Sequence, residues 1–239
     1  MSDPAPVNGV PQPSGVRELD ASRRLVRAFR SDPVDHALLA ALVDTASRSP
    51  SAGKTQGWNL VVLEGAATET FWSATMTDET RAGFRWRHLF AAPMIVLSFA
   101  DPQAYLDRYS ESDKSRNQRS EARSEPGVVR GEARADLGES LAAWPAPYWT
   151  IDASFATMTL LLAAHDAGLG ALFFGVFSGE DELRRTLGVP QRLQLLGAIA
   201  LGYERTPTEA ETNDPAFGRG LSAARSRAAT SDIIHYGAW

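Results

Sequence analysis

Three arginines near the start of the chain are the first side chains with an obvious chemistry. Arg23, Arg24 and Arg27 lie within one short stretch of sequence. On a helix, Arg23 and Arg27 would lie one turn apart on the same face. Two guanidinium groups in that arrangement can hold one phosphate through charge-assisted, bidentate hydrogen bonds. A solvated basic patch has the same spacing, so the motif predicts either a phosphate clamp or a surface patch.

A second candidate for chemistry is the segment 49–58, which reads SPSAGKTQGW. Its small residues and its proline let the backbone approach a flat ligand closely, and its hydroxyls and amides offer hydrogen bonds. An ordinary loop between a helix and a strand has a similar composition. The segment therefore predicts either a ligand-contacting loop or a simple connection.

Several other chemistries are excluded or disfavoured by composition. Cysteine is absent, which excludes disulfides, thiolate metal sites, iron–sulfur clusters and a thiol nucleophile. The four histidines do not pair at metal-ligand spacing, so we predict no metal site. A reductase of this composition would need a cofactor as its electron carrier. The net charge of −5 does not favour nucleic acid or an acidic membrane as a partner.

The elements that must position these residues are helices and strands mixed without regular alternation. Apolar residues at helical spacing predict a helix after Asp32, which can act as its N-cap, and a helix over 151–166 that is apolar on nearly all sides. Further helices are expected within 69–90 and directly after Ser178, which we expect to act as the N-cap of the second one. Short apolar runs predict strands at 58–63, 94–99, 171–177 and 195–201. This order predicts a single α+β domain with a sheet covered by helices.

Two segments fall outside this pattern. Residues 1–18 are rich in proline and glycine, and we expect a disordered leader before a single domain over 19–239. Residues 107–139 are dense in charge of both signs, within an insertion at about 103–147. The insertion is either a solvated helical or mobile segment or a lid over an active site. No signal peptide or membrane span is recognisable, so we expect a cytoplasmic protein without a membrane partner.

The order and spacing of these motifs resemble the nitroreductase family. The resemblance runs from about Ser22 to Trp239 and begins with RRLVRAF at 23–29, followed by PSAGKTQGW at 50–58. Five later motifs continue it: LLLAAHDAGLG at 160–170, FG at 174–175, LGVP at 187–190, LGY at 201–203 and DIIHYGAW at 232–239.

The resemblance implies a nitroreductase-like fold, with a central, mostly antiparallel sheet flanked by helices, and an intertwined homodimer that holds FMN at its interface. The arginine motif would contact the phosphate, the ribityl chain or the ring edge, and the second motif would approach the ring from the partner subunit. A backbone N–H of the FG motif would lie near flavin N5. A late arginine would reach the phosphate, with Arg227 preferred over Arg225. The implied cofactor-binding residues are Arg23, Arg24, Leu25, Arg27, Pro50, Ser51, Ala52, Gln56, Phe174, Gly175 and Arg227.

Two residues of the second motif depart from the family pattern. Lys54 stands where asparagine is common, and Gly57 stands where proline is common. Lys54 would either add positive charge near the flavin or the NAD(P)H phosphates, or face solvent. After the insertion, Trp144, Tyr148 and Trp149 would either line the pocket of the electron acceptor or pack in the core.

The resemblance implies an FMN-dependent oxidoreductase that passes electrons from NAD(P)H through the flavin to a nitroaromatic, quinone or similar electrophilic small molecule. It implies no obligatory acid or base, so we predict no catalytic side chain. Two alternatives stay open. One is the same fold with a different flavin chemistry, such as dehalogenation, flavin fragmentation or dehydrogenation. The other is a flavin-binding or interaction protein without turnover.

Overall fold

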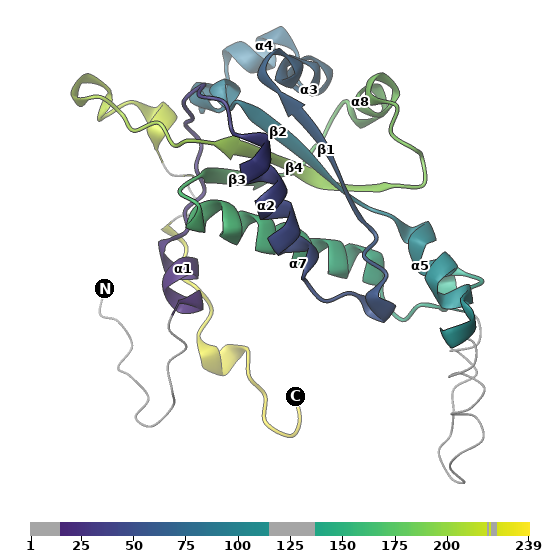
Figure 1. Cartoon of the computed structure of the whole chain (residues 1–239). Helices are drawn as coiled ribbons and strands as arrows, with labels where there is room; N and C mark the ends of the chain where they lie inside the picture. Colours follow the sequence, from purple (N-terminus) through teal and green to yellow (C-terminus); the bar gives the residue numbers. More distant parts are fainter. Residues whose placement is uncertain (1–14, 115–136, 219, 221–223) are drawn as a thin grey trace.

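The computed structural model describes residues 15–114, 137–218, 220 and 224–239. A four-stranded sheet forms its centre, in the order β1-β2-β4-β3, and every neighbouring pair of strands is antiparallel (Figure 1). The strands are β1 (Trp58–Glu64), β2 (Met94–Ala100), β3 (Gly170–Phe174) and β4 (Gln194–Gly202). All four segments predicted as strands are confirmed, and with them the α+β class.

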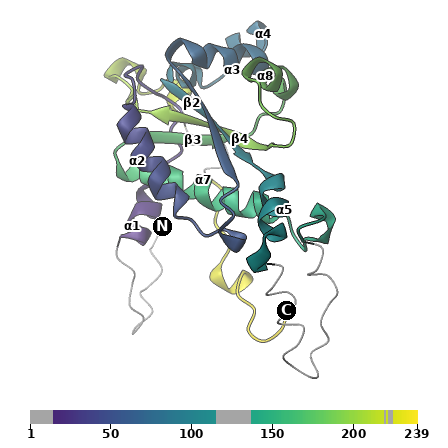
Figure 2. The ribbon, with the colours of Figure 1, turned by 45° about the vertical axis from the view of Figure 1, so that its right-hand side comes forward.

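Helices cover both faces of this sheet. They are α1 (Val16–Ser22), α2 (His36–Ser47), α3 (Thr68–Thr75), α4 (Asp78–Ala82), α5 (Pro102–Ser110), α7 (Tyr148–Asp166) and α8 (Glu180–Leu187). Figures 1 and 2 show α2 crossing α7 on one face of the sheet, and α3 beside α8 on the other. Because the sheet is covered twice, the central strand β2 is buried at every position.

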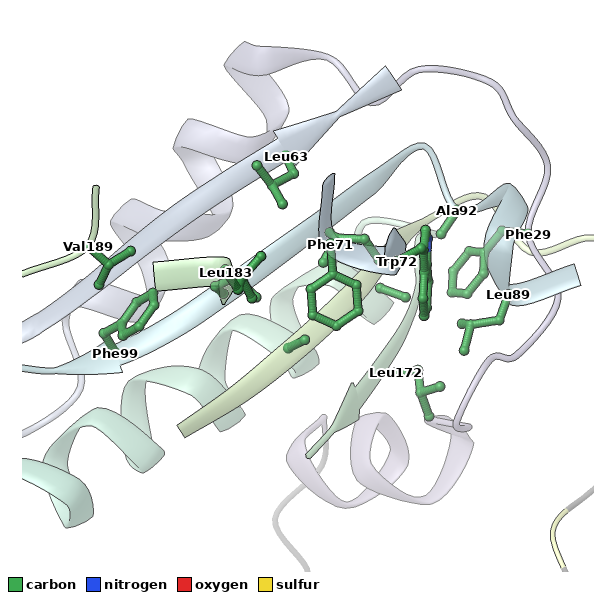
Figure 3. Packing of buried hydrophobic residues seen from close by; sticks show 14 of the residues in the cluster. Phe29, Leu63, Phe71, Trp72, Leu89, Ala92, Phe99, Leu172, Leu183 and Val189 are labelled. Atoms are coloured by element: carbon green, nitrogen blue, oxygen red, sulfur yellow. The ribbon is translucent and has the colours of Figure 1, made fainter. Parts of the chain in front are cut away.

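Two apolar clusters lie between the layers. On the α3 and α8 face, Phe71 and Trp72 pack edge to face at 4.9 Å, and Leu183 of α8 joins them (Figure 3). On the other face, Leu42 of α2 and Leu160 of α7 belong to one cluster. The helical spacing that predicts a helix through Leu42 and a buried helix through Leu160 is therefore confirmed, although α7 begins at Tyr148 and not at Ile151.

Two predicted helix caps are wrong. Helix α2 is capped by Asp35, whose carboxylate accepts a hydrogen bond from Ala37 N at 2.6 Å, and not by Asp32. Helix α8 begins after Gly179, in a left-handed conformation with φ of 74°. Ser178 instead donates its hydroxyl to the Thr75 carbonyl at 2.8 Å. This bond draws the chain away from the sheet toward α3, which is why β3 ends at Phe174 rather than at 177.

The three arginines do not lie on a helix, so the one-turn spacing considered for Arg23 and Arg27 does not apply. Helix α1 ends at Ser22, and the chain continues extended along the edge of the sheet. Leu25 forms a parallel bridge with Ala171 of β3, and Phe29 forms an antiparallel bridge with Glu204. Side chains on extended backbone alternate between two sides. Arg23 and Arg27 therefore owe any common orientation to a strand period and not to a helical turn.

Part of the charged insertion lies outside the described residues. Helix α5 covers its beginning, and a short 3-10 helix, η5 (Leu141–Ala143), covers its end. Residues 115–136 are not described, nor is the leader segment 1–14, so the expectations of a lid and of a disordered leader stay predictions. Helix α1 begins at Val16, inside the range expected for the leader. Within the described residues, no helix is both long enough and apolar enough to span a membrane.

Candidate cofactor site

The three arginines line a cavity of ≈ 840 Å³ between the extended segment 23–28 and the segment that follows β4. The extended segment forms one wall, together with Ala21, and residues between 204 and 220 form the other. The two walls are joined by backbone hydrogen bonds, including the bond from Arg205 N to the Ala28 carbonyl at 2.9 Å. The cavity is therefore built by two segments that lie far apart in the sequence.

Within this cavity the three arginines have different surroundings. The Nε of Arg23 is buried and has no hydrogen-bond partner among the described residues. Arg24 forms an ion pair with Glu204 at 2.9 Å, and its side chain is 62% exposed. Arg27 stacks on the Trp86 ring, 5.0 Å from the ring centroid, and only donates to the Leu25 carbonyl at 3.4 Å. Arg23 and Arg27 thus keep donors for a ligand, whereas Arg24 already has a carboxylate.

Trp86 holds two guanidinium groups in place beside the cavity. Arg85 also lies over its ring, at 5.6 Å, and donates from Nε to the Pro215 carbonyl. Burial, and then the charge of Arg85, lower the pKa of Arg27. The indole N–H of Trp86 donates to the Gly218 carbonyl at 3.1 Å. This part of the site carries excess positive charge, and an anionic ligand would relieve it.

The wall after β4 is fastened by a polar network around Arg205. Its Nη2 donates to both carboxylate oxygens of Glu211, at 2.8 and 3.0 Å, and its Nη1 lies 3.0 Å from His88 Nε2. Hydrogen bonds from Arg205, and then from Thr208, lower the pKa of Glu211 to about 2. Burial, and then the charge of Arg205, lower the pKa of His88. His88 is therefore neutral at pH 7, and the network is balanced in charge.

The arginine segment pairs with Ala171 of β3, and the Phe174–Gly175 backbone follows at the far end of that strand. Val26 N donates to the Ala171 carbonyl at 3.2 Å. Phe174 lies three residues after Ala171, about 10 Å farther along β3. The Phe174 ring stacks parallel to Trp72 at 6.1 Å inside the core. Only the backbone at this position can therefore face a ligand.

The predicted loop residues Pro50, Ser51, Lys54 and Gln56 come together in a second cavity of ≈ 560 Å³. The loop contains the 3-10 helix η1 (Ala52–Lys54), and its backbone is unusual. Lys54 and Gln56 have φ of 57° and 54°, values that cost free energy for residues other than glycine. Strain of this kind persists where surrounding contacts enforce it, and it concentrates at functional sites.

The arginine cavity lies near the C-terminal end of α7, whereas the loop cavity and its loop run from Thr159, which bonds to Ser49 Oγ at 2.8 Å, toward the N-terminal end. Next to the arginine segment, Ser22 Oγ lies 2.8 Å from His165 Nε2, near the C-terminal end of α7. At the other end, Ala52 N donates to Asp152 at 2.8 Å. The stretch of α7 between Asp152 and His165 rises about 20 Å. Figures 1 and 2 show the same separation, with α1 at one end of α7 and the loop before β1 at the other.

The aromatic residues predicted to bind the acceptor form a cluster with α5. Trp144 is buried and contacts Tyr105, Tyr109, Tyr148 and Trp149, with ring centroids 4.7–6.5 Å apart. None of these residues lines either of the two cavities. The geometry favours the core-packing alternative for Trp144, and acceptor binding by the cluster stays a prediction.

Two further predictions concern the late arginines and the absence of a metal site. Arg227 and Arg225 are exposed and do not line the arginine cavity of this single chain. Among the described residues, no group of histidine, aspartate and glutamate side chains could hold a metal ion. The histidines have other partners: His36 binds Glu64 at 2.7 Å, and His235 stacks on Trp239 at 4.1 Å.

Sequence reasoning missed several residues that shape the site. Trp86 lies within 69–90, where helices were expected, and Arg205 lies in the polar segment after the last strand, and no local signal gave either residue a role in the site. Asp152 is different, because it is an acidic residue in the middle of an otherwise apolar stretch. A buried carboxylate needs hydrogen-bond donors, so its position alone could have predicted a polar contact. Phe177, beside Gly175, was also overlooked, and its side chain is 98% exposed.

Comparisons with known proteins agree with this architecture. A family model described as the nitroreductase family matches residues 21–203. An NADH dehydrogenase of Thermus thermophilus is 29% identical over 181 residues, covering 76% of this chain and 82% of that protein. The structure of a nitroreductase family protein from Streptococcus pneumoniae superposes with a TM-score of 0.61 at 19% identity, covering 92% of this chain and 98% of that one.

A structure from Desulfovibrio desulfuricans, described as a nitroreductase in complex with FMN, has a TM-score of 0.57 at 18% identity and covers 93% of this chain and 96% of that one. The antiparallel sheet covered by helices on both faces is the fold that these solved structures share with this chain. The chain belongs to the nitroreductase family.

Proposed function

We propose that this protein binds FMN and passes electrons from NAD(P)H through the flavin to an electrophilic small molecule, such as a nitroaromatic compound or a quinone. The observation that carries the proposal is the pair Arg23 and Arg27. Both line the larger cavity, and neither has a carboxylate partner among the described residues. The FMN complex of the relative from Desulfovibrio desulfuricans supports the same cofactor.

The residues present fit FMN in both charge and layout. The buried Nε of Arg23 lacks an acceptor among the described residues, and a phosphate oxygen would supply one. The excess charge around Arg27 suits an anion, since burial and Arg85 both lower its pKa. From this segment, β3 leads about 10 Å to the Phe174–Gly175 backbone, a distance that a phosphate, a ribityl chain and a ring can bridge.

We further propose that the working protein is a homodimer. The Pro50–Gln56 loop lies about 20 Å along α7 from the arginine segment of its own chain, so the loop would approach the flavin of a second copy. Helix α7 also exposes Phe155 (48%) and Met158 (37%), three residues apart and therefore on one face. Contiguous exposed apolar side chains of this kind mark an association surface.

In the bound state, FMN would supply hydride acceptance from NAD(P)H and electron transfer to the acceptor. The contribution of the chain is binding and orientation. Arg23 and Arg27 would hold the anionic end, and the backbone beyond Phe174 would present an N–H to the ring edge. Pro50, Ser51 and Ala52, from the second copy, would limit access to the ring face. This division needs no catalytic acid or base.

Purification and reconstitution test the proposal directly. We expect a yellow protein with close to one FMN per chain, and NADH or NADPH oxidation that depends on an acceptor such as nitrofurazone or menadione. A colourless protein that cannot be reconstituted with FMN would refute the cofactor assignment. Bound FMN that NAD(P)H reduces, without turnover of either acceptor, would favour a different flavin chemistry. Bound FMN that NAD(P)H does not reduce would favour a binding protein.

A further inference from the structure

Asp152 is a buried carboxylate in α7 that the proposed electron transfer does not use. It is 8% exposed and lies in the first half of a helix whose other buried residues are mainly apolar. One of its oxygens, Oδ2, accepts two hydrogen bonds from different parts of the chain. Ala52 N donates at 2.8 Å, and the Tyr105 hydroxyl donates at 2.7 Å. Burial and the bond to Asp152 raise the pKa of Tyr105, so the hydroxyl stays protonated and remains the donor.

The backbone that Asp152 contacts is the strained part of the loop. Ala52 is the first residue of η1, and the next residues include Gly53 and Lys54 with φ of 63° and 57°. Gln56 follows with φ of 54°, and its backbone N–H donates to Ser51 Oγ at 3.1 Å. An isolated loop would relax from these conformations, so the contacts around it must hold them. The bond to Asp152 ties the first residue of η1 to α7, and the bond between Ser49 Oγ and Thr159 Oγ1 at 2.8 Å ties the preceding loop to the same helix.

Helix α5 packs against the same loop from its other side. Tyr105 lies so close to Gly57 that a Cβ at that position would be 2.9 Å from Tyr105 Cε2. Arg108 Nε donates to the Gly53 carbonyl at 2.8 Å. The Asp152 carboxylate therefore joins three elements at one point, α7, α5 and η1. The buried Tyr105 also explains why glycine occupies position 57.

We propose that Asp152 is a positioning residue that holds the Pro50–Gln56 loop in its strained, ligand-ready conformation through the Ala52 amide, with the Tyr105 hydroxyl as a second anchor on the same oxygen. A carboxylate is suited to this role because it is a strong acceptor that can receive both bonds in the interior. The importance of the loop for FMN rests on the proposed function. The positioning role itself does not, since it is a property of the chain without cofactor.

Amide hydrogen exchange of the cofactor-free, full-length protein tests the role directly. In Asp152→Ala, we expect peptides covering residues 51–56 to exchange about tenfold faster or more, because a buried hydrogen bond to a charged group is lost. Asp152→Asn keeps a weaker, neutral acceptor, so its loop should exchange at an intermediate rate. Tyr105→Phe should leave the Ala52 bond in place and accelerate exchange mainly in α5.

Thr157→Val provides the matched control. Thr157 lies in α7, is 5% exposed and hydrogen bonds to Ser98 Oγ at 2.9 Å, which also accepts from the Trp58 indole, so its network reaches the start of β1 but no residue of 51–56. This variant removes a buried hydrogen bond of the same helix and should leave exchange at 51–56 unchanged. Loop exchange that is equal in wild type and Asp152→Ala would overturn the proposal. If Asp152→Ala does not fold, Asp152→Asn decides the question. A loop in Asp152→Asn that exchanges as slowly as the wild-type loop would also overturn the proposal.

A second measurement connects the role to the cofactor. With FMN added to the same proteins, we expect the dissociation constant of Asp152→Ala to rise about tenfold, and that of Thr157→Val to stay within about twofold of wild type. An unchanged affinity in Asp152→Ala, despite faster loop exchange, would remove the link to the cofactor. A wild-type protein that binds no FMN would refute the proposed function, and the exchange experiment would still decide the role of Asp152.

Discussion

At the scale of single residues, the structure separates arginines that look equivalent in the sequence. Arg24 is neutralised by Glu204 at the surface, whereas Arg23 has a buried donor without a partner among the described residues and Arg27 stacks on Trp86 beside a second guanidinium. An exposed ion pair contributes little to stability, while a buried donor without a partner is costly. The surroundings of Arg23 and Arg27 therefore support their proposed role in binding an anion more than those of Arg24 do.

This difference predicts unequal effects on FMN binding. Arg23→Ala should raise the FMN dissociation constant by about 10- to 150-fold, because a hydrogen bond to a charged group contributes about 1.5–3 kcal/mol. Arg24→Ala should change it far less, because its guanidinium is already paired. Fluorescence titration of both variants with FMN measures the effect, and circular dichroism confirms that they fold. Equal losses in the two variants would contradict this ranking.

At the scale of elements, the junction between α3 and α8 depends on a glycine. Gly179 has φ of 74°, and a Cβ there would lie 1.8 Å from the Ala74 carbonyl oxygen. Gly188, at the other end of α8, has φ of 65°, but a Cβ there would meet no atom of the described residues within 4 Å. The two positions therefore share backbone strain, and only one adds a steric clash.

The glycine pair gives a controlled prediction. Gly188→Ala should lower the free energy of unfolding by about 1–2 kcal/mol, the cost of a left-handed alanine. Gly179→Ala should lower it by about 1–3 kcal/mol more, because α8 must move away from α3. Urea unfolding of both variants measures the difference. Equal destabilisation would show that the α3–α8 contact relaxes without cost.

The network that fastens the wall after β4 predicts a pH dependence. The fold lowers the pKa of His88 below 6.5, so it favours the neutral ring. A lowered pKa contributes stability that is fully present above the unfolded value and is lost as the pH falls through the folded one. The contribution of His88 to the free energy of unfolding should therefore be smaller at pH 5.5 than at pH 7.5.

His88→Gln removes this contribution and should show a weaker dependence over the same interval. His36 acts in the opposite direction, because its bond to Glu64 raises its pKa, but it is present in both proteins and cancels in the comparison. Denaturant unfolding at the two pH values gives the measurement. Parallel pH profiles for the wild type and His88→Gln would mean that His88 titrates normally.

At the scale of the whole molecule, the predicted cofactor-binding residues of one chain line two separate cavities. Under the proposed function, the loop that reaches Asp152 of α7 would serve the flavin of a second chain, and α7 exposes Phe155 and Met158 on one face. Pairing two chains would bring complementary halves together and bury this face. The same event would then complete the site and stabilise the fold.

A charge on the exposed face of α7 should therefore affect assembly and cofactor together. We expect Phe155→Glu to give monomers in sedimentation experiments and to lose FMN, because a carboxylate cannot be buried there without a partner. Leu141→Glu is the control, since Leu141 is also an exposed apolar residue (37%) but lies in η5. A Phe155→Glu protein that stays dimeric would place the interface elsewhere.

Local patterns in the sequence determined much of this protein. Alternating or continuous apolar runs predicted all four strands, and helical spacing predicted α2 and α7, because burial of one face imposes a period on the residues themselves. The order of short motifs, from the arginines to the glycines after α7, was enough to identify the family. Candidate site residues such as Pro50, Ser51 and Gln56 do share one cavity.

The tertiary structure decided what depends on residues far apart in the chain. The sequence left the backbone conformation of residues 23–27 open, and pairing of Leu25 with Ala171 of β3 holds this segment extended. Only the fold shows that Glu204 occupies Arg24 and that Asp152 receives the Ala52 amide. Such contacts join residues separated by 100 positions or more, and no period in the sequence encodes them.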